Sequence, residues 1–229
     1  MSFIILQLII ETSRTTLQWV GFCIGARRIT RTGFPSRAWI VGSAIVSALW
    51  LCGIVLAASS NALGPAAVPV AVVTTLIAGF GLLAIPGYRT VIGAIPPHWL
   101  IAIQVFRIVG GTFLIRYGQN SLPGAFAIPA GTGDLVTGIL APFVAYGLAS
   151  GKSWGRGAAI AWNIFGIADL VDALALGITF LGSGLTFPTI LIPIYGVPRA
   201  IILHGYSLIG LLRGSRQNQP AWPSVRPAE

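Results

Sequence analysis

Charged side chains are scarce in this 229-residue sequence. Only 8% of its residues are Asp, Glu, Lys or Arg, whereas hydrophobic residues make up 55%. A soluble domain carries roughly 25% charged residues, so a chain of this composition would expose large apolar patches to water. The composition therefore excludes an ordinary soluble domain and indicates a membrane protein.

Cysteine, lysine and histidine are scarce as well. Two cysteines, Cys23 and Cys52, are too few for a disulfide framework or a cysteine metal site. The single lysine, Lys152, lies between apolar runs, which excludes a retinal Schiff base within a span. His98 and His204 are expected at different depths, which argues against a haem held by both. Because no phosphate-binding, dinucleotide-binding or metal-ligand motif is present either, we expect no cofactor and no metal.

Long apolar runs are what the sequence does contain. A helix needs about 20 apolar residues to cross the ~30 Å hydrocarbon core of a bilayer. The segments of about this length are 38–58, 66–86, 99–118, 125–148, 157–180 and 187–212. We therefore predict an all-α, polytopic bundle of about six transmembrane helices, which forms one domain over residues 38–212.

The two ends of the chain differ from these runs. Residues 1–37 hold two short apolar pieces split by ETSRTT, and neither piece is long enough to cross a bilayer. We interpret them as a basic N-terminal extension, interfacial or poorly ordered, which would become a further span only if Glu11 and Arg14 found partners. Residues 213–229 are polar and proline-rich, and we expect a disordered cytoplasmic tail.

Basic residues between the runs predict the orientation. They gather before the first run, after the last run and in every second loop; they are Arg14, Arg27, Arg28, Arg31, Arg37, Arg89, Lys152, Arg156, Arg213, Arg216 and Arg226. Short cytoplasmic loops are enriched in Lys and Arg, so both termini are predicted on the cytoplasmic side of the inner (plasma) membrane. The net charge of +9 then indicates membrane lipids as partners, and no nucleic acid.

Charged residues also fall inside the predicted spans; they are Arg107, Asp134, Asp169, Asp172 and Arg199. A charge at the bilayer centre costs roughly 2.5–3.5 kcal/mol on insertion scales, so we expect these groups to face inward and pair, or to line a wet cavity. Arg107 and Arg199 are each expected to pair with one of the aspartates. One carboxyl is then left over, and it would be protonated, share a proton or bind a cation.

Polar and small residues recur at intervals of three in the fifth run; they are Asn163, Gly166, Asp169 and Asp172. This spacing covers about half of a helix, and we predict that this half faces inward. The segment GTGDLV at 131–136 is also similar to GIADLV at 166–171. Their aspartates would lie at similar depth in antiparallel neighbours and could meet across a common cavity. The alternative interpretation is a packing stripe of small and polar residues.

Three stretches of the second half resemble known sequences. They are VFRIVGGTFLIRYGQNSLPGAFAIPAGTGD, WNIFGIADLVDALALG and IPIYGVPRAIILHG. Together they resemble a widespread group of uncharacterised bacterial integral membrane proteins, over about residues 96–212. The resemblance implies a small multi-helix membrane protein and carries no known activity.

Three functions are compatible with these features. The leading hypothesis is passage or exchange of a small solute or ion through a polar core of spans three to six. The candidate binding or charge-relay residues are Arg107, Asp134, Asn163, Asp169, Asp172, Arg199 and His204. The alternatives are an intramembrane enzyme acting on a lipid-like substrate, with an aspartate as base and His204 as its partner, and a structural or assembly subunit. Enzymatic activity and self-association into a homo-oligomer are left open.

The orientation is testable by labelling. Lys152→Cys is expected to be protected from a membrane-impermeant thiol reagent in intact cells, whereas Asn61→Cys is expected to react. Both changes are made in a chain that lacks Cys23 and Cys52. Strong labelling at position 152 with none at position 61 would reverse the predicted orientation.

Overall fold

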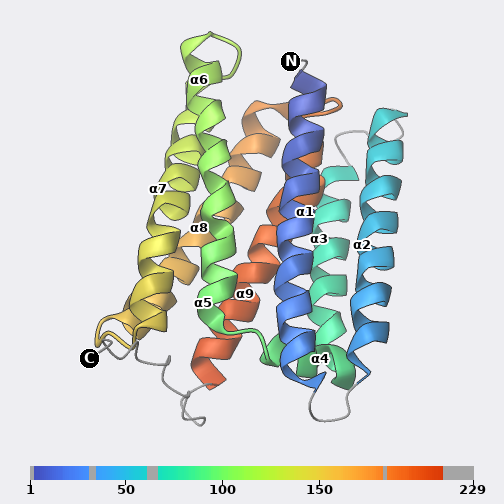
Figure 1. Ribbon diagram of the computed structural model, residues 1–229. Helices are drawn as coiled ribbons and strands as arrows, with labels where there is room; N and C mark the ends of the chain where they lie inside the picture. Colours follow the sequence, from blue (N-terminus) through green and yellow to red (C-terminus); the bar gives the residue numbers. More distant parts are fainter. Residues whose placement is uncertain (1–2, 31–34, 61–66, 183–184, 214–229) are drawn as a thin grey trace, which may run out of the picture.

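The computed structural model describes residues 3–30, 35–60, 67–182 and 185–213. These residues form a bundle of helices that contains no β-strand in the described ranges (Figure 1). Within the described part of the chain, five helices are long and apolar enough to cross a membrane; they are α2 (Ser36–Ser59), α3 with its 3₁₀ extension (Ala67–Ala84), the composite helix Pro97–Gly118, α7 (Gly124–Ala149) and α8 (Gly155–Phe180). The all-α membrane bundle and the first five predicted spans are thereby confirmed.

The third of these helices changes its winding in the middle. It begins as α5 (Pro97–Ala102), continues as the 3₁₀ helix η3 (Ile103–Gly111) and ends as α6 (Thr112–Gly118). A 3₁₀ helix has three residues per turn, so Gln104 and Arg107 lie on one face, and both are buried. Gln104 Nε2 donates to the carbonyl of Ala200, at 3.0 Å, and this bond ties η3 to the neighbouring helix α9.

The predicted sixth span is shorter than its apolar run. Helix begins near Ile192, with a π-helical turn, η5 (Ile192–Gly196), and continues as α9 (Val197–Arg213). The preceding residues form turns, because Pro188 and Pro193 each lack a backbone donor. A short helix, α4 (Pro86–Gly93), which the sequence analysis missed, joins α3 to α5.

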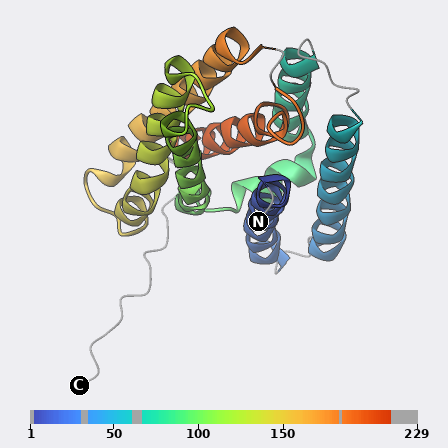
Figure 2. The ribbon, with the colours of Figure 1, turned by 90° about the horizontal axis from the view of Figure 1, so that it is seen from above.

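Helix α9 runs through the centre of the bundle. Seen from above, the other helices surround it (Figure 2), and it packs against α3, α5 and α8. Polar side chains of α9 are fully buried there, with His204 and Ser207 both 0% exposed. Because α9 is enclosed by protein, it carries polar groups that a lipid-facing helix would not tolerate.

Residues 3–28 form a continuous helix, α1 (Phe3–Arg28), which packs on α2 and α4 and runs along the length of the bundle (Figure 1). Residues 3–28 of the predicted N-terminal extension are therefore helical and ordered, whereas their predicted interfacial placement stays a prediction. The polar side chains in the middle of this helix have hydrogen-bond and ion-pair partners. Glu11 accepts from Gln7 Nε2 at 3.1 Å and pairs with Arg14 Nη1 at 3.2 Å.

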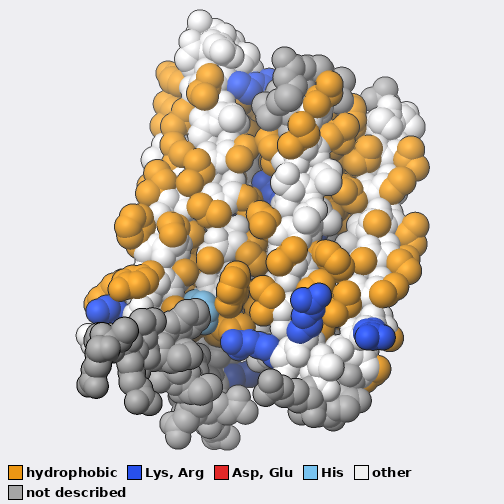
Figure 3. All heavy atoms as spheres, in the orientation of Figure 1, with side chains coloured by type: hydrophobic (Ala, Val, Ile, Leu, Met, Phe, Trp, Pro, Cys, Tyr) orange, Lys and Arg blue, Asp and Glu red, His pale blue; other side chains and the backbone are white. Residues whose placement is uncertain are grey.

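The two ends of the bundle differ in charge. The end of α1, the α7–α8 connection and the end of α9 lie at one end (Figure 1), and basic side chains gather there (Figure 3). This agrees with the charge pattern expected of a cytoplasmic face. The start of α1 lies at the opposite end. The predicted cytoplasmic placement of the N-terminus depends on residues 1–37 not crossing the membrane, and it stays a prediction. The predicted disordered tail lies outside the described residues from position 214 onward.

Candidate functional site

Arg107 connects the helices at the middle of the bundle. Its side chain is only 2% exposed. Its Nε donates to Asp134 Oδ1 on α7 at 2.6 Å, and its Nη2 donates to Asp169 Oδ2 on α8. One guanidinium thus pairs with both aspartates of the two similar segments, as expected from their similar depth in neighbouring helices.

A chain of hydrogen bonds between neutral side chains extends from the same guanidinium to α9. Arg107 Nη1 donates to the carbonyl of Gly166 and contacts His204 Nε2, both at 3.2 Å. Arginine has no acceptor, so His204 Nε2 must accept and the ring proton lies on Nδ1, which is 3.0 Å from Asn163 Oδ1. The Asn163 amide nitrogen in turn lies 3.1 Å from Ser207 Oγ. The hydrogen bonds therefore require a neutral imidazole.

Glycines on the neighbouring helices make room for this network. An added Cβ would overlap a network side chain at Gly110, Gly133 and Gly166. The overlapped side chains are, in the same order, Asp134, Asp169 and His204. These glycines are therefore needed so that the two aspartates and the imidazole can lie close to the neighbouring helices. The sequence indicated only that small residues allow general helix packing.

Arg199 belongs to a second cluster, so the expectation that it pairs with an aspartate is wrong. Its Nη1 donates to Thr15 Oγ1 at 3.0 Å and to the hydroxyl of Tyr195, and its guanidinium carbon lies 4.6 Å from the centre of the Tyr195 ring. Arg199 and His204 are five positions apart, which places them about 140° apart around a helix. Arg199 consequently faces α1, while His204 faces α8.

Helix α1 supplies two further core charges, Glu11 and Arg14, whose pairing the sequence analysis had left open. Glu11 is 0% exposed and pairs with Arg14, whose guanidinium carbon also lies 4.4 Å from the centre of the Phe106 ring. The signal in the sequence was a glutamate and an arginine three positions apart between two apolar pieces. The core charges now balance: the carboxylates are Glu11, Asp134 and Asp169, and the guanidinium groups are Arg14, Arg107 and Arg199.

Asp172 does not face the core, and the prediction that it does is wrong. Along α8, Asn163 and Gly166 are buried, Asp169 is partly exposed and Asp172 is exposed. Each step of three residues falls about 60° short of a full turn, so the strip reaches the opposite face by its last member. Within the described ranges, Asp172 forms no hydrogen bond or ion pair.

Two small cavities, each of about 50 Å³, meet at Asp134. One extends from Asp134 past Phe126 towards Arg116 at the end of α6. The other lies between Asp134, Arg107 and Arg14. A water molecule needs roughly 10–15 Å³ of such space and a few polar partners, so both cavities can hold water. His204 lines neither of them.

Apolar helices arranged around buried, paired charges define an α-helical integral membrane protein. Residues 65–212 match the family described as Domain of unknown function (DUF8737), and the chain belongs to this family. The match includes Arg107, both paired aspartates and His204, whereas α1 and α2 lie outside it. No curated protein and no solved structure matches the chain.

The role of the glycines gives a stability prediction. Gly166→Ala places a methyl group on the His204 ring, and such overpacking costs about 1–3 kcal/mol. Gly157→Ala, on the same helix, places the same group where nothing lies within 4 Å. Alanine stabilises a helix interior relative to glycine by roughly 0.5–1 kcal/mol, so this control is expected to be at least as stable as the original protein. Thermal unfolding in detergent measures both, and equal stability of the two variants would contradict the close-approach role.

Proposed function

We propose that the protein passes protons across the membrane through its core, with Asp134 as the exchanging group. One observation carries the proposal: Asp134 lines both small cavities and shares the Arg107 guanidinium with Asp169. Of the two carboxylates, Asp134 is the more accessible, with its side chain 19% exposed against 9% for Asp169. Buried carboxylates that face water-filled space are the usual elements of intramembrane proton relays.

The size of the cavities favours protons over a larger solute. Cavities of about 50 Å³ hold a few waters, whereas small-molecule sites occupy about 300–1,000 Å³. A proton needs only a carboxylate and water on each side. The hypothesis that the core passes a small solute or ion is therefore narrowed to the passage of protons.

The balance of charges around Arg107 also supports uptake and release of a proton at Asp134. Arg107 faces two carboxylates, so this cluster carries one excess negative charge when both are ionised. A proton on Asp134 leaves a neutral Arg107–Asp169 pair, and its release restores the excess charge. The proton would arrive through water on the Arg116 side and leave through water on the Arg14 side, or the reverse.

Catalysis is less well supported by the geometry. An acid–base pair acting on a substrate needs an aspartate and a histidine within reach of one site. His204 instead contacts Arg107 and Asn163 and is 0% exposed. A purely structural role would be expected to leave no water-sized space at the paired charges, whereas two such cavities meet at Asp134.

The proposal includes a membrane placement. The basic end of the bundle faces the cytoplasm, α1 is a further span, and the membrane is the inner (plasma) membrane. The alternation of basic segments supports the orientation. The length of α1, 26 residues, exceeds the about 20 that a span requires.

Proton flux into liposomes tests this function. Asp134→Asn is expected to abolish uptake measured by an enclosed pH-sensitive dye under an imposed membrane potential. Asp172→Asn is the matched control, because Asp172 is exposed and lines neither small cavity, and it should keep the original flux. A flux in the original protein equal to that of empty liposomes, or an unchanged flux in Asp134→Asn, would refute the proposal.

Infrared difference spectra measure whether Asp134 and Asp169 carry a proton. A protonated-carboxyl band that responds to pH is expected, and it should change in both Asp134→Asn and Asp169→Asn, since the two groups share one guanidinium. A spectrum without such a band would show that the pair stays ionised and serves packing.

A further inference from the structure

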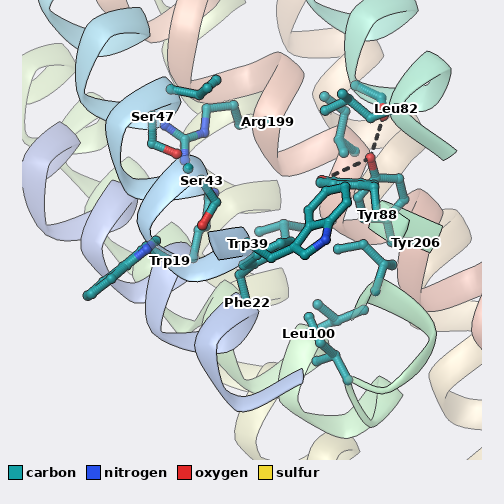
Figure 4. A pocket seen from close by; sticks show the side chains of 18 of the residues that line it. Trp19, Phe22, Trp39, Ser43, Ser47, Leu82, Tyr88, Leu100, Arg199 and Tyr206 are labelled. Atoms are coloured by element: carbon teal, nitrogen blue, oxygen red, sulfur yellow. Dashed lines mark hydrogen bonds between the residues drawn. The ribbon is translucent and has the colours of Figure 1, made fainter. Parts of the chain in front are cut away.

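A much larger cavity, of about 480 Å³, lies beside α9 and is bordered by residues of α1, α2, α3, α4 and α5 (Figure 4). Its volume falls within the about 300–1,000 Å³ of small-molecule sites. Aromatic rings form much of its wall; they belong to Trp19, Phe22, Trp39, Tyr88 and Tyr206. Such rings bind flat apolar groups by stacking and edge-to-face contacts.

Among the described residues that line this cavity, Arg199 is the only one with a charged side chain. It lies on the wall with Ser43 and Ser47 in the same region of the cavity (Figure 4). Its described hydrogen bonds use Nη1 alone, towards Thr15 and Tyr195, and it forms no ion pair with a carboxylate of the described residues. Its remaining N–H groups are therefore free of a described partner at the edge of an apolar space.

The charge of the surrounding cluster points to an anion. Arg14 and Arg199 face a single carboxylate, Glu11, which already pairs with Arg14. The cluster thus carries one excess positive charge at the wall of the cavity. A guanidinium binds a carboxylate through two parallel hydrogen bonds in planar geometry, which makes arginine the preferred residue for such ligands.

We propose that this cavity binds an organic anion with one carboxylate and a compact aromatic body. The carboxylate contacts Arg199, and the aromatic body packs among the tryptophan and tyrosine rings. This site is separate from the proton path at Asp134, and it does not rest on the proposed proton passage.

The depth of Arg199 distinguishes such a ligand from a membrane phospholipid. Arg199 lies 14 positions before the end of α9 at Arg213, which corresponds to about 21 Å along a helix. A phospholipid head group bound there would lie deep in the hydrocarbon region, far from its normal position. A compact acid can instead place its carboxylate there and its apolar body in the cavity.

Neutral polar groups around the cavity suit the same ligand. Gln18 and Ser47 can donate to the carboxylate lone pairs that Arg199 leaves unfilled, and Gln18 Nε2 is buried with no partner among the described residues. The Ser43 hydroxyl already donates to the carbonyl of Ile40, at 2.9 Å. Burial raises the pKa of Tyr88, at the α4 end of the cavity, so its hydroxyl stays neutral. The wall therefore offers donors and no competing negative charge.

The sequence provides a matched pair of variants that separates binding from folding. Gly42 lines the cavity, and a Cβ there would meet nothing within 4 Å. Gly42→Leu therefore adds a bulky side chain at the wall of the cavity, with a Cβ that meets no neighbouring atom. Gly53 lies on the same helix, has the same open surroundings and does not line the cavity, so Gly53→Leu is the control.

Calorimetric titration of the protein in nanodiscs, with empty nanodiscs as reference, tests the proposal. The probes are 2-naphthoate and its neutral analogue 2-naphthalenemethanol. The original protein and Gly53→Leu should bind the acid roughly tenfold or more tightly than the alcohol. Arg199→Gln should lose this preference, Arg199→Lys should keep part of it, and Gly42→Leu should bind neither probe.

Several results would overturn the site. They are equal binding of acid and alcohol by the original protein, unchanged binding of the acid by Gly42→Leu, and heats no larger than those of empty nanodiscs. Because these measurements involve no proton flux, their failure is distinguishable from failure of the proton proposal.

Discussion

A single buried guanidinium organises the middle of this protein. Arg107 pairs with Asp134 and Asp169 and contacts His204, so it connects η3 with α7, α8 and α9. A lone charge at this depth would cost several kcal/mol, which makes the partners obligatory. The 3₁₀ winding of η3 presents Arg107 to the interior, and glycines on the facing helices let the carboxyl groups and the imidazole approach closely.

The core contains two charge clusters with opposite excess. The Arg107 cluster has one carboxylate too many, and the Arg14–Arg199 cluster has one carboxylate too few. A small cavity lined by both Arg14 and Asp134 lies between them. Each excess supports a separate proposal, since a shared carboxyl can take up a proton and an unpaired guanidinium can hold an anion. Helix α1 contributes to both proposals, because Arg14 lines the small cavity beside Asp134 and Trp19 and Phe22 line the large cavity.

Apolar run length and the pairing of opposite charges could be predicted from the sequence, because both follow from the cost of leaving polar groups in hydrocarbon. The proximity of Asp134 and Asp169 was predicted from their similar depth in neighbouring helices, whereas their sharing of the single Arg107 guanidinium was not. The direction of each side chain could not be predicted, because it depends on helix rotation. Arg199 and Asp172 were misplaced for this reason. Residues 1–37 were interpreted as an interfacial or poorly ordered extension because the polar residues at the centre of α1 lower its hydropathy. The contact between Thr15 and Tyr195, which holds α1 in the bundle, joins residues 180 positions apart and could not be predicted.

The most direct test of the central role of Arg107 is the stability of charge-matched variants. Arg107→Gln leaves Asp134 and Asp169 without their counter-charge, and breaking a buried pair in this way costs about 3–5 kcal/mol. Adding Asp134→Asn and Asp169→Asn removes the stranded charges. The account predicts that the triple variant recovers most of the free energy of unfolding, measured by reversible denaturation in mixed micelles. A triple variant no more stable than Arg107→Gln alone would contradict it.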